Sequence, residues 1–214
     1  MASWIKHNYP YFPILGFILY LLVFLLAALQ YPGGSFNLPQ SSGYSFFHNF
    51  LCDVMDPITK GGILNPARSL AVVSHIILSL TMISFFYMLP EIFERKSSNF
   101  FMIRYFGMFT MSVFMLMATS YHDLIVTLTG VLGTLALIPF FIELRYYPEK
   151  RLTQLAYCCF FMSIVVFFIF ESKIGFYYLP FLQKITFMLD AWWVIWVSLI
   201  VQRKRRKLTY QNAL

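Results

Sequence analysis

Six apolar segments, each long enough to cross a lipid bilayer, limit what this chain can fold into. They cover residues 13–30, 69–89, 99–117, 123–142, 152–170 and 184–201. A hydrocarbon core of ~30 Å requires ~20 apolar residues in a helix. Charged residues make up 12% of the chain, whereas a soluble domain has about 25%, so the charges are too sparse to cover a water-soluble surface. The sequence therefore predicts an all-α polytopic membrane protein with a single domain, a bundle of six transmembrane helices.

Lysine and arginine residues predict the orientation of this bundle. With the N-terminus inside, the outside segments hold four basic residues, Lys60, Arg68, Lys173 and Lys184. The inside segments then hold twelve: Lys6, Arg95, Lys96, Arg104, Arg145, Lys150, Arg151 and the run from Arg203 to Lys207. Cytoplasmic loops carry the excess of basic residues, so we expect both termini in the cytoplasm and, in a bacterium, the inner membrane.

The net charge of +7 also bears on the partners of the protein. Five basic residues gather in the tail 202–214, directly after an apolar segment. This pattern is typical of an anchor against anionic lipids. It favours membrane lipids as partners and argues against nucleic acid, and it leaves the oligomeric state open.

The first outside loop, residues 31–68, is much longer than the others and begins with the turn signal Tyr31-Pro32-Gly33-Gly34. Within it, residues 44–56 have helical periodicity. Apolar side chains fall on one face, and the other face carries Ser45, His48, Asn49, Cys52, Asp53 and Asp56. The pattern predicts a short amphipathic helix that is too short to span the membrane, so it lies on the outer surface or in the mouth of the bundle.

Ionisable residues inside membrane segments are costly and are candidates for function. His75 is seven residues from Arg68, or ~10 Å deep, and Asp190 is six residues from Lys184, or ~9 Å deep. Both therefore lie at one level and are predicted to form a buried pair. We expect an outward-facing polar pocket, to which these further residues contribute: Arg68, His122, Asp123, His48, Asn49, Asp53 and Asn65.

Several functions fit such a pocket. The leading hypothesis is binding of a lipid or small amphiphile, with Arg68 meeting an anionic head group and His48, Asn49, Asp53 and Asn65 completing the site. The alternative is a lipid-modifying hydrolase or transferase that uses His75, Asp190, His122 and Asp123 as acid–base groups. In that case His75, His122 and Asp190 could hold zinc, although no HxxxH, HExxH or GxSxG motif is present. A small transporter and a structural membrane subunit are the remaining hypotheses.

Purely structural roles compete with each functional one. Asp190 could simply pair with His75 or Arg68, since a lone carboxylate is unfavourable in hydrocarbon. His122 and Asp123 could only cap the fourth helix.

The first outside loop also resembles a known family. The stretches Tyr31–Ser35, Gly43–Phe46, Asn49–Asp53 and Asn65–Pro66 are similar to those of the bacterial six-helix membrane proteins called domain of unknown function 998, themselves distantly similar to the eukaryotic Frag1/DRAM group. The chain departs from the family at Cys52, where members tend to have Ser. The resemblance implies the six-helix topology and draws attention to the first loop, and it implies no reaction.

Overall fold

The structure, a computed structural model, describes residues 8–94 and 97–211 and is helical, with no strand among these residues. Six long helices run in chain order: α2 (Phe12–Gln30), α3 (Arg68–Met88), α4 (Ser98–Phe114), α5 (His122–Leu144), α6 (Lys150–Ser172) and α7 (Leu179–Gln211). Short 3-10 helices extend α2, α3 and α4. All six helices are long and apolar enough to cross a bilayer, which confirms the predicted all-α fold and makes the chain an integral multi-pass membrane protein.

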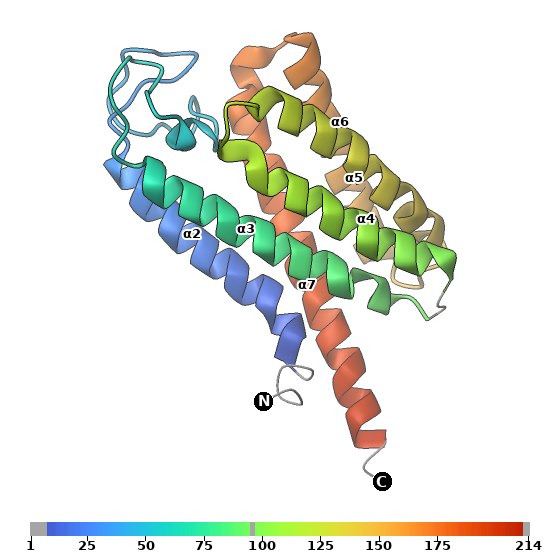
Figure 1. The fold of residues 1–214 in the computed structure, drawn as a ribbon. Coiled ribbons are helices and arrows are strands. Elements are labelled where there is room, and N and C mark those ends of the chain that lie inside the picture. Colours follow the sequence, from blue (N-terminus) through green and yellow to red (C-terminus); the bar gives the residue numbers. More distant parts are fainter. Residues whose placement is uncertain (1–7, 95–96, 212–214) are drawn as a thin grey trace.

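The helices form two groups. Helices α2, α3, α4 and α5 pack side by side in chain order, α6 pairs with α7, and α7 crosses α2 and α3 (Figure 1). Helix α2 begins and α7 ends at the same end of the bundle, which we call the terminal end; the long loop 31–67 lies at the other, the loop end. Which end faces the cytoplasm stays a prediction, and Lys6, Arg95 and Lys96 lie outside the described residues.

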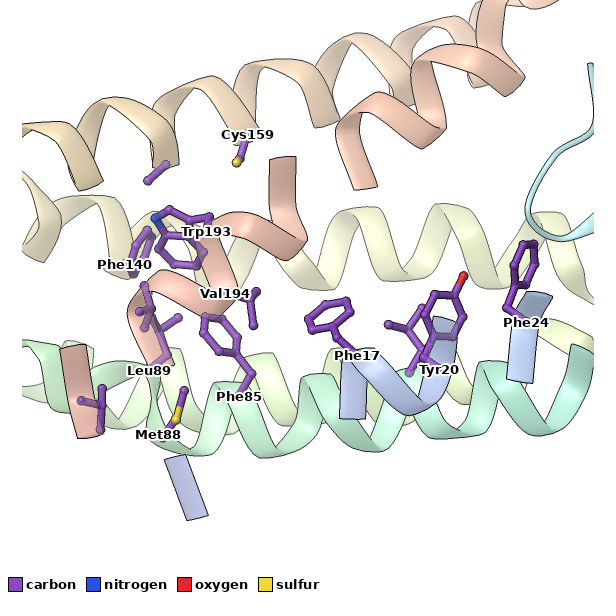
Figure 2. Packing of buried hydrophobic residues seen from close by; sticks show 14 of the residues in the cluster. Phe17, Tyr20, Phe24, Phe85, Met88, Leu89, Phe140, Cys159, Trp193 and Val194 are labelled. Carbon is purple, nitrogen blue, oxygen red and sulfur yellow. The ribbon is translucent and has the colours of Figure 1, made fainter. Parts of the chain in front are cut away.

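An aromatic cluster fills the terminal half of the bundle. The Trp193 ring of α7 packs edge-on against Phe85 of α3 and Phe140 of α5, with ring centroids 5.5 Å and 5.4 Å apart (Figure 2). Such edge-to-face pairs stabilise by about 0.5–1.5 kcal/mol beyond the area that they bury. The cluster therefore joins the two helix groups at this level.

Glycine permits close helix approach at two places. A Cβ on Gly16 of α2 would lie 2.0 Å from the Thr81 hydroxyl of α3, and one on Gly107 of α4 would lie 2.1 Å from the Phe86 ring of α3. No larger residue fits there, and small residues at helix interfaces are typical of membrane bundles. The outer face of α2 is exposed and almost wholly aliphatic, as expected of a surface that contacts lipid.

Two elements differ from the sequence prediction. Residues 44–56 do not form one amphipathic helix; turns lead into a 3-10 helix at Asp53–Met55. The physical reason is that the Asn49 and Asp53 side chains accept hydrogen bonds from the backbone N–H groups of Ser45 and Phe50, and such local bonds compete with helix formation. Helix α7 begins at Leu179, five residues before the predicted start at Lys184, and continues through the basic run to Gln211.

Candidate functional site

Residues 31–67, which we call the loop cap, fold into a compact structure around Asn49. This side chain is fully buried. Its Oδ1 accepts from the Ser45 N–H at 2.9 Å, and its Nδ2 donates to the Gly34 carbonyl at 2.8 Å and to Asp53 Oδ2 at 3.0 Å. Asp53 Oδ2 also accepts from the Phe50 N–H at 2.9 Å. Asn49 and Asp53 are thus occupied in holding the loop cap together.

The other candidates from the first loop are also structural. Asn65 Nδ2 donates to the Val54 and Asp56 carbonyls, each at 2.8 Å, and Arg68 Nε donates to the Met55 carbonyl at 3.3 Å. The His48 ring packs near Tyr177, with centroids 5.9 Å apart. These side chains join the loop cap to α3 and to the turn before α7.

Lys184 attaches the loop cap to α7. It is 3% exposed, and its Nζ donates to the Asn49 carbonyl and, at 3.0 Å, to the Pro180 carbonyl. One residue earlier, Gln183 Oε1 accepts from the Leu51 N–H at 3.0 Å. From the sequence, Lys184 is expected only as an outside charge at a helix start. The earlier start of α7 is what carries it into the interior.

A cavity of about 1180 Å³ lies beneath the loop cap, between α5, α6 and α7 and the inner faces of α2, α3 and α4. Its lining reaches Leu78 in α3, Leu137 in α5 and Asp190 in α7, so it extends roughly 15–22 Å from the loop end. One turn further along α5 and α7, Phe140 and Trp193 belong to the aromatic cluster that closes off the terminal half.

The walls of this cavity are mostly apolar, and most of its charged residues gather where it opens at the loop end, whereas Asp190 lies deep inside. We call Asp56, Lys60, His122, Asp123 and Lys173 the cavity rim. Asp56 and Lys60 form an ion pair at 2.9 Å, and His122 Nδ1 lies 2.9 Å from Asp123 Oδ1. Asp123 is well exposed to solvent at this end.

All four catalytic candidates line the cavity, but the predicted pairing of His75 with Asp190 does not occur. His75 Nε2 donates to the Phe114 carbonyl at 2.8 Å, and Asp190 hydrogen-bonds Cys159 of α6. The earlier start of α7 explains the difference. Asp190 lies eleven residues beyond Leu179, ~16 Å deep, whereas His75 lies seven residues beyond Arg68, ~10 Å deep.

Four of the five predicted ligand-binding residues do not line the cavity. Arg68, Asn49 and Asn65 lie outside its lining, as does His48, whereas Asp53 belongs to it. Within residues 8–94 and 97–211, no three His, Cys, Asp or Glu side chains come together in a way that could hold a metal ion. The zinc ligand set suggested by the sequence, His75, His122 and Asp190, is therefore not assembled.

Burial changes the acid–base behaviour of the loop cap. It raises the pKa of the Asp53 carboxyl above its ordinary value, and the hydrogen bonds from Asn49 and Phe50 oppose part of that rise. It also raises the pKa of the Cys52 thiol, which is free. A thiol is nucleophilic only as the thiolate, so the raised pKa disfavours the reactive form of Cys52 while the loop cap is folded.

The raised pKa of Asp53 predicts a pH-dependent stability. A carboxyl whose pKa is higher when folded stabilises the fold in its protonated form, and this contribution is lost as the pH rises from the ordinary ~3.9 through the raised value. Asp53→Asn keeps an oxygen acceptor but does not titrate. We expect the melting temperature of the wild type to fall, relative to that of Asp53→Asn, between about pH 4.5 and about pH 7.5. A difference that is the same at both pH values would contradict this role.

Comparison of the chain with protein-family models, curated proteins and solved structures gives no match. The resemblance to the domain of unknown function 998 family therefore stays a prediction from the loop residues. The geometry of the cavity carries the functional argument.

Proposed function

We propose that this membrane protein binds a lipid or small amphiphile in the cavity beneath the loop cap. The observation that carries the proposal is the mainly apolar interior of the cavity, in which Asp190 and His75 are the deep polar groups, together with the charged rim at the loop end. Ligand sites are typically concave, about 300–1,000 Å³ in volume, and mainly apolar with a few placed polar groups. The cavity, at about 1180 Å³, is concave and mainly apolar in the same way. An amphiphile would place its apolar chain in the interior and its polar head at the charged rim.

Lys173 is the rim residue best suited to meet an anionic head group. Lys60 is paired with Asp56. Among the residues that the structure describes, Lys173 has no carboxylate partner, and its Nζ contacts only the rings of Phe170 at 4.2 Å and Phe176 at 4.9 Å. Lys173 therefore takes the place that the sequence analysis gave to Arg68, which lies outside the lining.

The backbone of Lys173 supports this assignment. It is the one non-glycine residue with a positive φ, 61°, in the described part of the chain, and it ends α6. Side chains larger than glycine are uncommon in this left-handed region except for Asn and Asp. Strained conformations of this kind concentrate at functional sites.

Removal of the Lys173 charge should release the anionic lipid. We expect Lys173→Asn, which tolerates the left-handed backbone, to reduce the anionic phospholipid that co-purifies in mild detergent by about tenfold, since a charge-assisted contact contributes about 1.5 kcal/mol. Mass spectrometry of the extracted lipid gives the amount per protein chain.

Two variants make this test specific. Lys173→Arg should retain the lipid, because it keeps the charge. Lys150→Asn should also retain it, since Lys150 is an exposed lysine at the opposite end of the same helix. Equal retention in Lys173→Asn and Lys150→Asn would contradict the role of Lys173, and a wild-type protein that carries no lipid would contradict the proposed function.

An enzyme is the second candidate, because His75, His122, Asp123 and Asp190 all face the same cavity. Acid–base catalysis requires a base within hydrogen-bond reach of the proton that it removes. His75 is bonded to a backbone carbonyl and Asp190 to Cys159, so two of the four candidates are engaged within the fold. His122 and Asp123 pair with each other, but at the rim and not in the interior of the cavity. Binding without chemistry is therefore the function that the geometry favours.

A further inference from the structure

The wall of the cavity is thin on the side of the bundle between α5 and α6, and we call this place the side opening. Three lining residues are also exposed: Val131 is 58% exposed, Ile164 is 48% exposed and Phe167 is 36% exposed. Val131 and Ile164 share helix faces with Ile138 and Phe168, which are exposed and lie outside the lining, so these faces point away from the cavity. A side chain that borders an internal cavity and the exterior at once marks a place where the wall between them is thin.

This side opening lies at the depth of the hydrocarbon. Val131 is nine residues beyond the start of α5 at His122, or ~13 Å, and Ile164 is eight residues before the end of α6 at Ser172, or ~12 Å. The hydrocarbon core is ~30 Å thick, so both residues contact acyl chains and not water. A group that enters the cavity at this depth comes from the hydrocarbon core, so it is an apolar group such as an acyl chain.

Contacts between α5 and α6 limit the side opening towards the loop end and towards the terminal end. At the loop end, Thr127 Oγ1 of α5 donates to Glu171 Oε1 of α6 at 2.8 Å. Towards the terminal end, the Phe141 ring of α5 packs on Tyr157 and Phe160 of α6, with centroids 5.0 Å and 4.8 Å away. Between these two contacts the helices are not bridged by a hydrogen bond or an aromatic pair in the described part of the chain.

Phe167 closes the space that remains. It faces Gly130 of α5, where an added Cβ would lie 2.9 Å from the Phe167 ring. The aromatic ring thus rests against a residue without a side chain, and a change of its rotamer would clear the opening. Phe167 lies six residues before Lys173 on the same helix, ~9 Å away along the axis, so a chain beside Phe167 and a head group at Lys173 belong to one molecule of phospholipid size.

We infer that the ligand is a membrane phospholipid with an anionic head group, whose acyl chain enters the cavity sideways from the bilayer between α5 and α6, past Phe167. This inference rests on the proposed function and names its ligand class and its route. The loop cap then covers the cavity from the aqueous side, and the head group stays at the rim beside Lys173.

The rate of lipid exchange tests the route. The full chain is reconstituted in vesicles of phosphatidylglycerol, moved to vesicles of chain-deuterated phosphatidylglycerol, and sampled over time by mass spectrometry of the bound lipid. Phe167→Ala should exchange about fivefold faster than the wild type, because it removes the ring that rests against Gly130 and closes the opening, and a fivefold change corresponds to a barrier lower by about 1 kcal/mol. Phe168→Ala is the matched control: Phe168 is 59% exposed on the same helix and lies outside the lining, so its exchange should be unchanged.

Narrowing the opening should have the reverse effect. Val131→Trp places a large ring in the opening and should slow the exchange about fivefold by the same reasoning. Ile138→Trp, two turns along the same face of α5 and outside the lining, should leave it unchanged. If bound lipid depends on Lys173 but exchanges at the wild-type rate in Phe167→Ala and Val131→Trp, the side route is wrong while the proposed function stands. If the wild type binds no lipid at all, the proposed function fails first.

Discussion

Lys184→Met is expected to release the loop cap from α7 and to lower the melting temperature of the protein. Methionine keeps the length of the buried stem but donates no hydrogen bond, so the Asn49 carbonyl loses the partner that Lys184 provides. A buried carbonyl without a partner costs about 2 kcal/mol. For a chain of this size that corresponds to a decrease of roughly 4–8 °C.

The reactivity of the Cys52 thiol measures the release of the loop cap from α7 independently of the melting temperature. Cys52 belongs to the loop cap, and burial raises its pKa, so it should react slowly with a water-soluble maleimide in the wild type and faster in Lys184→Met. Peptide mapping separates this label from that on Cys158 and Cys159. The control is Lys60→Met, which breaks only an exposed i,i+4 pair with Asp56, a change of about 0–0.5 kcal/mol. Unchanged melting and slow labelling in Lys184→Met would show that other contacts hold the loop cap.

The six membrane spans could be predicted from the sequence because the property that decides them is local. An apolar run of the right length has no other stable conformation in a bilayer, where each backbone group must be bonded within its own helix. Five of the six predicted helices begin and end within a few residues of the observed ones. The start of α7 was harder to place, since Pro180 in its first turn is compatible with a helix start and Lys184 is charged.

The candidate site could be predicted in part. The depth of a side chain in the membrane, and the end of the bundle to which it is nearer, follow from its position along a helix. This was enough to place His75, His122, Asp123 and Asp190 around one cavity. Partners depend on how helices rotate and slide against each other, which periodicity does not determine. The pairing of His75 with Asp190 was therefore wrong, because it rested on a helix start that was five residues too late.

Residues of the loop cap were misjudged for a different reason. Asn49 and Asp53 lie at helical spacing, and this pattern alone predicts that both side chains are on the polar, solvent-exposed face of a helix. In the folded chain Asn49 Nδ2 donates to Asp53 Oδ2 and to the carbonyl of Gly34, fifteen residues before Asn49. A turn glycine far away in the sequence thus decides the local conformation, and no window of the sequence around Asn49 contains that information.

At the terminal end of the bundle, the Glu91 carboxylate connects several helices. Glu91, in the 3-10 helix Leu89–Ile92 after α3, accepts from the Tyr9 hydroxyl, lies 2.9 Å from Arg205 Nε of α7 and lies 3.6 Å from Arg104 Nη2 of α4. Lys204 Nζ donates to the Glu91 backbone carbonyl at 3.0 Å. These contacts join α7 to α3, to α4 and to the segment before α2, so that the basic run of α7 has a structural function in addition to the predicted contact with lipid.

Glu91→Gln is accordingly expected to destabilise the terminal end. Glutamine retains an acceptor for Tyr9 but removes the charge that offsets Arg104 and Arg205. Breaking a buried ion pair costs about 3–5 kcal/mol; these side chains are 16–29% exposed, so we expect about 2 kcal/mol and a decrease in melting temperature of roughly 4–8 °C. Glu94→Gln, at an exposed position three residues later, should melt as the wild type does.

Labelling of Cys52 also tests whether the two ends of α7 are held independently. If α7 is held independently at each end, Glu91→Gln lowers the melting temperature while Cys52 at the loop end still labels slowly, and Lys184→Met changes both. If Glu91→Gln also speeds the labelling of Cys52, then α7 moves as a rigid unit, and a disturbance at the terminal end reaches the cavity and its loop cap. If it melts as the wild type does, the aromatic packing of Trp193 with Phe85 and Phe140 is sufficient to hold α7, and the charge network is dispensable for folding.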